Sequence, residues 1–136
     1  MDKWDLRFLD MAELVASWSK DPAHKVGCVL VDQDRRVLSI GYNGPPKGVL
    51  DSYETKEEKN ARTLHAEHNA VLFARGERPH TAYIHPFFPC SNCCALLIQA
   101  GVQRIVATQD SISRKWNPAI TQAMCDEAGV ILEAVE

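Results

Sequence analysis

The sequence lacks a run of apolar residues long enough to cross a membrane, which takes about 20 consecutive residues. Its first residues, Met1-Asp2-Lys3-Trp4-Asp5, contain no apolar core of a signal peptide. Positive charge is not in excess either, because 15 Lys and Arg residues face 18 Asp and Glu residues, for a formal net charge of −3. Proteins that bind nucleic acid usually show a basic face. The composition therefore argues against a membrane and against nucleic acid as partners.

The chain also lacks repeats, low-complexity tracts and a linker between domains. A length of 136 residues with 46% hydrophobic residues is typical of one globular domain, so we expect residues 1–136 to form a single domain. Five cysteines without a signal peptide indicate a reducing compartment. The expected location is the cytoplasm, either of a bacterium or, for a viral protein, of the infected host.

Hydrophobic periodicity and the placement of Gly and Pro predict helices and strands that alternate after a leading hairpin. The predicted helices cover residues 4–19, 65–74, 90–100 and 116–128, and the predicted strands cover residues 26–31, 37–42, 81–85, 104–108 and 130–133. Residues 54–60 are strongly charged without a clear period, which indicates a solvated excursion. The order predicts an α/β fold, a three-layer α-β-α sandwich with a mixed five-stranded sheet.

Two short motifs carry the chemistry of the chain: His65-Ala66-Glu67 and, further on, Pro89-Cys90-Ser91-Asn92-Cys93. Cys90 and Cys93 are three residues apart, so on one helical turn both sulfurs face the same point. With His65 they form a set of three zinc ligands. Three protein ligands leave the fourth tetrahedral position open, as in a catalytic zinc site.

Glu67 is expected to take a proton from the attacking water and pass it to a leaving amine. A C-x-x-C motif alone is often a redox motif or half of a structural zinc site, and H-x-E alone says little. Together, each at the head of a predicted helix, they favour zinc. The pair H-x-E and P-C-x-x-C resembles the signature of the zinc-dependent nucleoside and nucleotide deaminases.

The remaining cysteines and histidines are interpreted as packing or surface residues rather than ligands. They are Cys28, Cys94, Cys125, His24, His68, His80 and His85. Residues 48–64, before the first motif, contain neither Cys nor His. We therefore expect one zinc ion per chain.

A closer resemblance, to the deoxycytidylate (dCMP) deaminase family, covers almost the whole chain. It rests on Gly41-Tyr42-Asn43-Gly44, on the segment from His65 through Asn69-Ala70, and on Gln99-Ala100-Gly101-Val102. The resemblance implies a cytidine-deaminase-like fold and hydrolysis of dCMP to dUMP and ammonia, which supplies dUMP for thymidylate synthesis. It also implies a hexamer, with dCTP as activator and dTTP as inhibitor.

The resemblance assigns roles to individual residues of this chain. His65, Cys90 and Cys93 match the zinc ligands, and Glu67 matches the proton shuttle. The substrate-binding candidates are Asn43, Ala66, Ser19 and Lys25, with Arg114 and Lys115 as further phosphate candidates, and the allosteric candidates are Gly44, Phe73 and Arg75. Several have plainer interpretations: Asn43 holds a left-handed turn, Lys25 is an edge charge, Phe73 is a core aromatic and Arg75 is solvated.

Other functions share the same motifs. A deaminase that acts on dCTP, cytidine, guanine or the adenosine of tRNA uses the same zinc and glutamate, although the tRNA enzyme needs a positive surface that this composition does not favour. A zinc-stapled interaction module is the alternative outside enzymes, and it predicts a fourth protein ligand.

Overall fold

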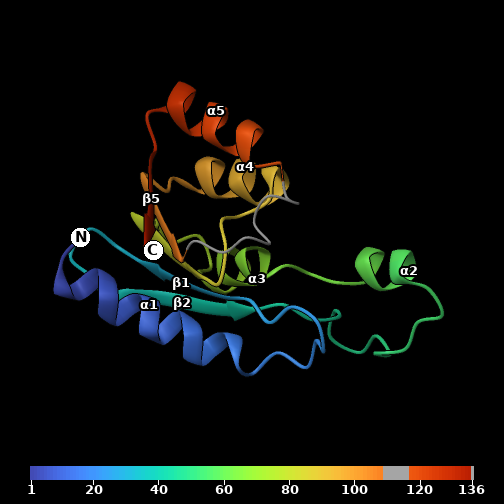
Figure 1. The fold of residues 1–136 in the computed structure, drawn as a ribbon. Helices are drawn as coiled ribbons and strands as arrows, with labels where there is room; N and C mark the ends of the chain where they lie inside the picture. The colour runs from blue at the N-terminus through green and yellow to red at the C-terminus, as the bar shows by residue number, and fades with distance from the viewer. Residues whose placement is uncertain (109–116, 136) are drawn as a thin grey trace.

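The computed structural model describes residues 1–108 and 117–135. Its elements follow in the order α1 (Lys3–Ala16), β1 (Gly27–Val31), β2 (Val37–Tyr42), α2 (Lys56–Ala61), α3 (Ala66–Phe73), β3 (Thr81–His85), α4 (Ser91–Ala100), β4 (Arg104–Thr108), α5 (Pro118–Ala128) and β5 (Ile131–Val135) (Figure 1). Asp2 begins α1 with a capping box, since its carboxylate accepts from the N–H groups of Trp4 and Asp5 and the Asp5 carboxylate accepts from the N–H of Asp2.

The strands form one mixed sheet of five strands in the order β2-β1-β3-β4-β5. The hairpin of β1 and β2 is antiparallel, and β1 also pairs antiparallel with β3. Strands β3, β4 and β5 run parallel, with α4 and α5 as the crossovers between them. This arrangement confirms the predicted α/β fold with a mixed sheet.

Each face of the sheet has its own hydrophobic core, because side chains alternate along a strand. On one face Val29, Val31, Tyr83 and Val106 pack under α1, with Phe8, Leu9, Ala12 and Val15 from that helix. On the other face Cys28, Leu30, Ile84 and Ile105 pack under α3 and α4. Figure 1 shows α1 below the sheet and α3 and α4 above it, with α5 outermost against α4. The three-layer prediction is confirmed.

Helix α3 is anchored on β2 at two points. A Cβ on Gly41 would lie 2.4 Å from the carbonyl oxygen of Ala66 and 2.4 Å from the nitrogen of Ala70, so only glycine permits this approach. Two residues earlier, the hydroxyl of Ser39 donates to the carbonyl of Ala70 at 2.6 Å. These contacts fix the start of α3, where the first motif lies, relative to the sheet.

The structure corrects several predicted boundaries. Helix α1 ends at Ala16 rather than at residue 19, and β5 covers Ile131–Val135 rather than residues 130–133. The predicted start of the last helix at residue 116 lies outside the described residues. The prediction of a solvated excursion without a period over 54–60 missed α2, which Thr55 begins by accepting a hydrogen bond from the N–H of Glu58. None of the helices in the described chain has the length and apolarity of a membrane span.

Candidate active site

His65, Cys90 and Cys93 come together as a group able to hold a metal ion. His65 is the N-cap of α3, Cys90 is the N-cap of α4, and Cys93 lies in the first turn of α4. The Nδ1 atom of His65 lies 3.1 Å from the Sγ of Cys93 and 3.5 Å from the Sγ of Cys90. All three ligand atoms lie within 4.8 Å of one another. The predicted ligand set is thus assembled from two helix starts.

These distances fit zinc. Ligands at the usual Zn–N and Zn–S distances, placed at tetrahedral angles, are separated from one another by about 3.6 Å. The two N–S separations of 3.1 and 3.5 Å are close to that spacing. One histidine and two cysteines also match the ligand types that zinc prefers. Among the described residues, His65, Cys90 and Cys93 form the one group that could hold a metal ion. This group accommodates a single ion per chain.

The surroundings of Cys90 favour the ionised form of its thiol. Its Sγ accepts a hydrogen bond from the backbone N–H of Cys93 at 3.4 Å, which caps α4. A hydrogen bond from the Cys93 side chain, with His65 beside it, lowers the pKa of the Cys90 thiol to about 4. A thiolate is the form that binds zinc. Nδ1 of the half-buried His68 lies 3.7 Å from the Cys93 sulfur, so His68 packs against a ligand.

Glu67 is almost fully enclosed next to this group, with 4% of its surface exposed. Burial, which disfavours the charged carboxylate, raises the pKa of Glu67 to about 7. A carboxyl group with such a pKa can both accept and return a proton near neutral pH. Its position in the first turn of α3, two residues after His65, holds it at the metal group.

A cavity of about 160 Å³ opens onto Glu67, His65 and Cys90. The other described residues that line it are Asp21, Ala23, His24, Val26, Asn43, Lys56, Lys59, Asn60, Thr63, Ala66, Phe87 and Phe88. Phe87 packs edge-on against the ring of His24, with 6.2 Å between ring centroids. The cavity therefore combines an aromatic wall, the metal group and Glu67, and charged side chains of α2.

Asn43 lines this cavity, and its amide also ties the cavity wall together. Its Nδ2 donates to the carbonyl of His24 at 2.8 Å, and its Oδ1 accepts from the N–H of Val26 at 2.9 Å. The alternative interpretation, a left-handed turn, is wrong. In the part of the chain that the structure describes, the non-glycine residues with positive φ are Arg35, Arg75 and Asn117.

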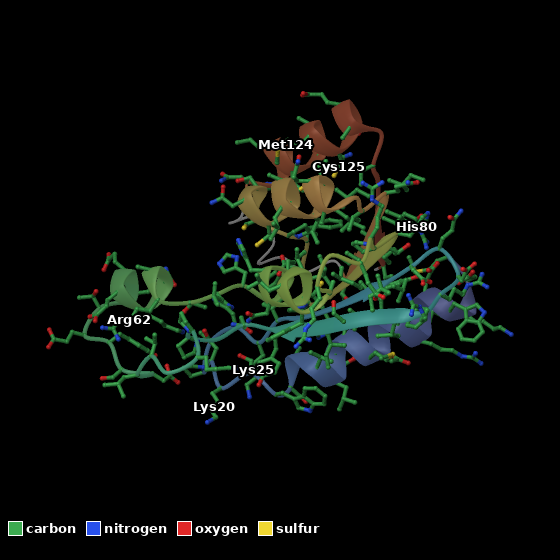
Figure 2. The ribbon with its side chains drawn as sticks, turned by 180° about the vertical axis from the view of Figure 1, so that it is seen from behind. Lys20, Lys25, Arg62, His80, Met124 and Cys125 are labelled. Carbon is green, nitrogen blue, oxygen red and sulfur yellow. The ribbon has the colours of Figure 1, made fainter. Side chains whose placement is uncertain are left out.

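Of the other substrate-binding candidates, the structure brings Ala66 into the cavity but not Ser19 or Lys25. Ser19 is buried; its hydroxyl donates to the carbonyl of Asn43 at 2.9 Å and accepts from the N–H of Asp21 at 3.2 Å. Lys25 is exposed and lies two residues before β1. Figure 2 shows Lys20 pointing away from the body of the molecule. Arg114 and Lys115 lie outside the described residues.

None of the three allosteric candidates is among the described residues that line the cavity at the metal group. Gly44 pairs with Leu64 through two backbone hydrogen bonds and lines a second, smaller cavity with Lys20, Asp21 and Arg62, among others. Phe73 is 60% exposed, so its interpretation as a core aromatic is wrong. Arg75 is exposed, as its plainer interpretation has it, and has a φ of 53°.

Helix α2 contributes to the cavity, which the amino-acid sequence did not predict. Lys56 and Lys59 both line it, and the Nζ of Lys59 lies 2.8 Å from the Oδ1 of Asp21. The available signal was the lysine spacing after Thr55, a helix-capping residue, but nothing in the sequence indicated which surface the lysines would face.

The three remaining cysteines pack as expected. Cys28 is buried in β1, and the buried Cys94 and Cys125 join α4 to α5 with 3.6 Å between their sulfurs. Figure 2 shows Cys125 on the side of α5 that lies against α4.

Comparison with known proteins places this site in a family. Residues 2–109 match the family described as the cytidine and deoxycytidylate deaminase zinc-binding region. The chain is 44% identical over 137 residues to a protein of Aliivibrio fischeri named uncharacterized deaminase in luxG 3′ region, covering 96% of this chain and 92% of that protein. It is 30% identical over 138 residues to the deoxycytidylate deaminase of Homo sapiens, covering 94% and 77%.

A solved structure shows the same fold. The crystal structure of dCMP deaminase from the cyanophage S-TIM5 in complex with dCMP and dUMP superposes with a TM-score of 0.79 at 24% identity, covering 99% of both chains. The family match extends over most of the chain and includes His65, Glu67, Cys90 and Cys93. The structure brings His65, Cys90 and Cys93 together, and His65, Cys90 and Glu67 line one cavity. The chain therefore belongs to the zinc-dependent cytidine and deoxycytidylate deaminase family.

Proposed function

We propose that this protein catalyses the hydrolytic deamination of dCMP to dUMP and ammonia, supplying dUMP for thymidylate synthesis. The observation that carries the proposal is that the buried Glu67 lines the same cavity as His65 and Cys90, two members of the group that they form with Cys93. The choice of dCMP is supported by relatives of 30% identity named deoxycytidylate deaminase.

A zinc ion held by His65, Cys90 and Cys93 supplies a Lewis-acidic centre that makes water nucleophilic near neutral pH. Glu67 accepts a proton from the water that attacks C4 of the cytosine ring. It then delivers the proton to the exocyclic amine, so that the C4–N bond breaks and ammonia leaves. The burial that raises the pKa of Glu67 to about 7 makes the carboxyl suited to both transfers.

The cavity wall supplies groups to orient the nucleotide. Ala66 is the first residue of α3, a helix without a side-chain cap, so its N–H has no acceptor within the helix. We propose that this N–H donates to the ring carbonyl of cytosine. Asn43 holds the segment from His24 to Val26 and keeps one amide hydrogen and one oxygen lone pair for the sugar. The hydroxyl of Ser19 donates a hydrogen bond to the backbone carbonyl of Asn43 and so helps to hold Asn43 in place.

Regulation and assembly follow the family resemblance. We propose dCTP as activator and dTTP as inhibitor, with Gly44 at the small second cavity as the candidate among the effector residues. We also propose a homohexamer of single-domain chains. A cytoplasmic location is supported by five cysteines that form no disulfide.

A substrate panel tests the proposal. Zinc-loaded protein is incubated with dCMP, dCTP, deoxycytidine, cytidine, guanine and a tRNA anticodon stem that contains adenosine, and ammonia release is measured. We expect dCMP to give the highest kcat/KM. A higher kcat/KM for another compound of the panel would assign the protein to the deaminases that act on that compound. Zinc binding without ammonia release from any compound of the panel would support an interaction module. Adding dCTP or dTTP to the dCMP reaction tests the regulation, and light scattering tests the hexamer.

A further inference from the structure

Helix α2 contributes two lysines to the active-site cavity that differ in how their charge is compensated. Lys56 and Lys59 lie three residues apart, on neighbouring positions of the helix surface, and both line the cavity. The rest of the cavity includes the metal group and Glu67. A nucleotide whose base reaches Glu67 thus has the side chains of α2 available for its other end.

The charge of Lys59 is compensated by Asp21. The 2.8 Å contact joins side chains that are only 17% and 11% exposed, and the Lys59 ammonium also lies 5.8 Å from the centre of the Tyr53 ring. Asp21 is itself fixed, since its Oδ1 accepts from the N–H groups of Ala23 and His24 at 2.8 and 3.0 Å. The pair connects α2 to the turn that precedes β1 and holds the helix at the cavity.

The charge of Lys56 is not compensated in this way. Its ammonium makes no ion pair or hydrogen bond with any residue of 1–108 or 117–135. Glu57 and Glu58 of α2 do not line the cavity. Since the charges of Asp21 and Lys59 cancel, Lys56 adds one uncompensated positive charge to the side chains that α2 contributes to the cavity wall. Lys25 and Ser19, to which the family resemblance assigns phosphate binding, are not among the described residues that line the cavity.

We propose that Lys56 binds the 5′-phosphate of the substrate and makes the enzyme prefer nucleoside monophosphates over unphosphorylated nucleosides. The Asp21–Lys59 pair acts as a positioning element that holds α2 at the cavity. This inference rests on the proposed deaminase function and adds the residue that selects for phosphate. Figure 1 shows α2 on an extension of the chain beyond the end of β2, and none of its residues is buried, so substitutions there leave both cores intact.

The test compares kcat/KM for dCMP and for deoxycytidine in the zinc-loaded full chain. A charge-assisted hydrogen bond lost in Lys56→Ala is expected to lower kcat/KM for dCMP by about 10- to 100-fold, chiefly through KM. The loss for deoxycytidine is expected to stay below about 3-fold, because that substrate has no phosphate for a charge-assisted bond. Lys56→Arg keeps the positive charge and is expected to retain most of the preference for dCMP.

Two further variants serve as comparisons. Lys47→Ala removes an exposed lysine outside both cavities and is expected to change neither rate. Lys25→Ala tests the residue suggested by the resemblance. If the preference for dCMP is unchanged in Lys56→Ala, or if Lys25→Ala alone abolishes it, the inference is wrong. Unchanged melting temperatures confirm that the variants fold.

The positioning role of the Asp21–Lys59 pair has its own test. Lys59→Met breaks the ion pair that holds α2 at the cavity, so kcat/KM for dCMP is expected to fall by about 10-fold. Asp21→Asn breaks the same ion pair from the other side, while an amide oxygen still accepts from Ala23 and His24. The double variant is expected to lose about as much dCMP activity as Lys59→Met alone. Recovery of most of the activity in the double variant would mean that Lys59 only neutralises Asp21, and would overturn the positioning role.

The proposed function and this inference fail in different ways. If the wild type releases no ammonia from dCMP, the proposed function is wrong. The inference about Lys56 is then tested by measuring, with calorimetry, the affinity of the wild type and of Lys56→Ala for dCMP. Weaker binding to Lys56→Ala than to the wild type supports a phosphate site at Lys56. Equal binding, or none to either protein, overturns it.

Discussion

Asp5 in α1 and Arg104 in β4 form a two-pronged ion pair between the first helix and the sheet. Nη1 and Nη2 of Arg104 donate to the two carboxylate oxygens of Asp5 at 2.7 and 2.8 Å, and the hydroxyl of Tyr83 donates to Asp5 at 2.7 Å. Arg104 also donates to Glu133 of β5 at 2.9 Å. Asp5 and Arg104 are 99 positions apart in the sequence. Together with their bonds to Tyr83 and Glu133, they connect α1 with β3, β4 and β5.

The first prediction is that Arg104→Met strongly destabilises the fold. Asp5 has 4% of its side chain exposed, and removing the arginine leaves its carboxylate buried without a cation, which costs about 3–5 kcal/mol. The measurement is the free energy of unfolding in urea. Arg36→Met, which breaks a pair whose arginine is 66% exposed, is the control and should change the unfolding free energy far less. Equal effects in the two variants contradict the prediction.

The second prediction concerns pH. The hydrogen bonds from Arg104 hold the pKa of the Asp5 carboxyl well below its usual range. In the unfolded chain the pKa of Asp is about 3.9, so the folded state binds fewer protons near that pH. The stabilisation is complete above about pH 5 and is lost as the pH falls from about 4 towards the folded pKa. The difference in unfolding free energy between wild type and Asp5→Asn should therefore shrink between pH 7 and pH 3. A constant difference would mean that Asp5 does not titrate in this way.

The third prediction is that Glu67→Gln keeps the zinc and the fold but loses most turnover. Glutamine has nearly the same shape but cannot accept the proton, and general acid–base catalysis contributes about 10²- to 10⁴-fold. Ammonia release and zinc content are measured on the same sample. Turnover close to that of the wild type in the zinc-loaded variant rules out Glu67 as the proton shuttle.

The fourth prediction separates ligand from packing cysteines on α4. Metal analysis should find one zinc per chain in the wild type and in Cys94→Ala, because the Cys94 side chain contacts α5. Cys90→Ala and Cys93→Ala should lose the metal. Their melting temperatures should fall as well, since metal binding at such a site is coupled to folding. Stoichiometric zinc in either variant removes that residue from the ligand set.

The fifth prediction is that Gly41→Ala disturbs the active site from outside it. The added methyl group would overlap the backbone of α3 at Ala66 and Ala70, and overpacking of this kind costs about 2 kcal/mol or more. Because α3 begins at the metal group, zinc affinity should fall as well. Gly44→Ala, whose Cβ would have no neighbour within 4 Å, is the control for stability. Normal zinc affinity in Gly41→Ala would show that α3 can shift without moving His65.

The helices and strands with clear periods, the layered order and the chemistry of the metal group could be predicted from the amino-acid sequence. The reason is that periodicity is local, and that each motif holds its functional atoms within one helical turn. His65 with Glu67, and Cys90 with Cys93, could be identified from the sequence because the two motifs together resemble the signature of the zinc-dependent deaminases.

Which distant residues share the cavity could not be predicted without the three-dimensional fold. Asn43 bonds to the backbone at His24 and Val26, Ser19 is buried behind it, and Lys59 meets Asp21 across 38 positions. Such contacts depend on how the segment between β2 and α3 folds back onto the turn before β1. This charged segment has no hydrophobic face that would indicate how it packs, so its sequence predicts solvent-exposed lysines. In the folded chain Lys56 and Lys59 line the cavity.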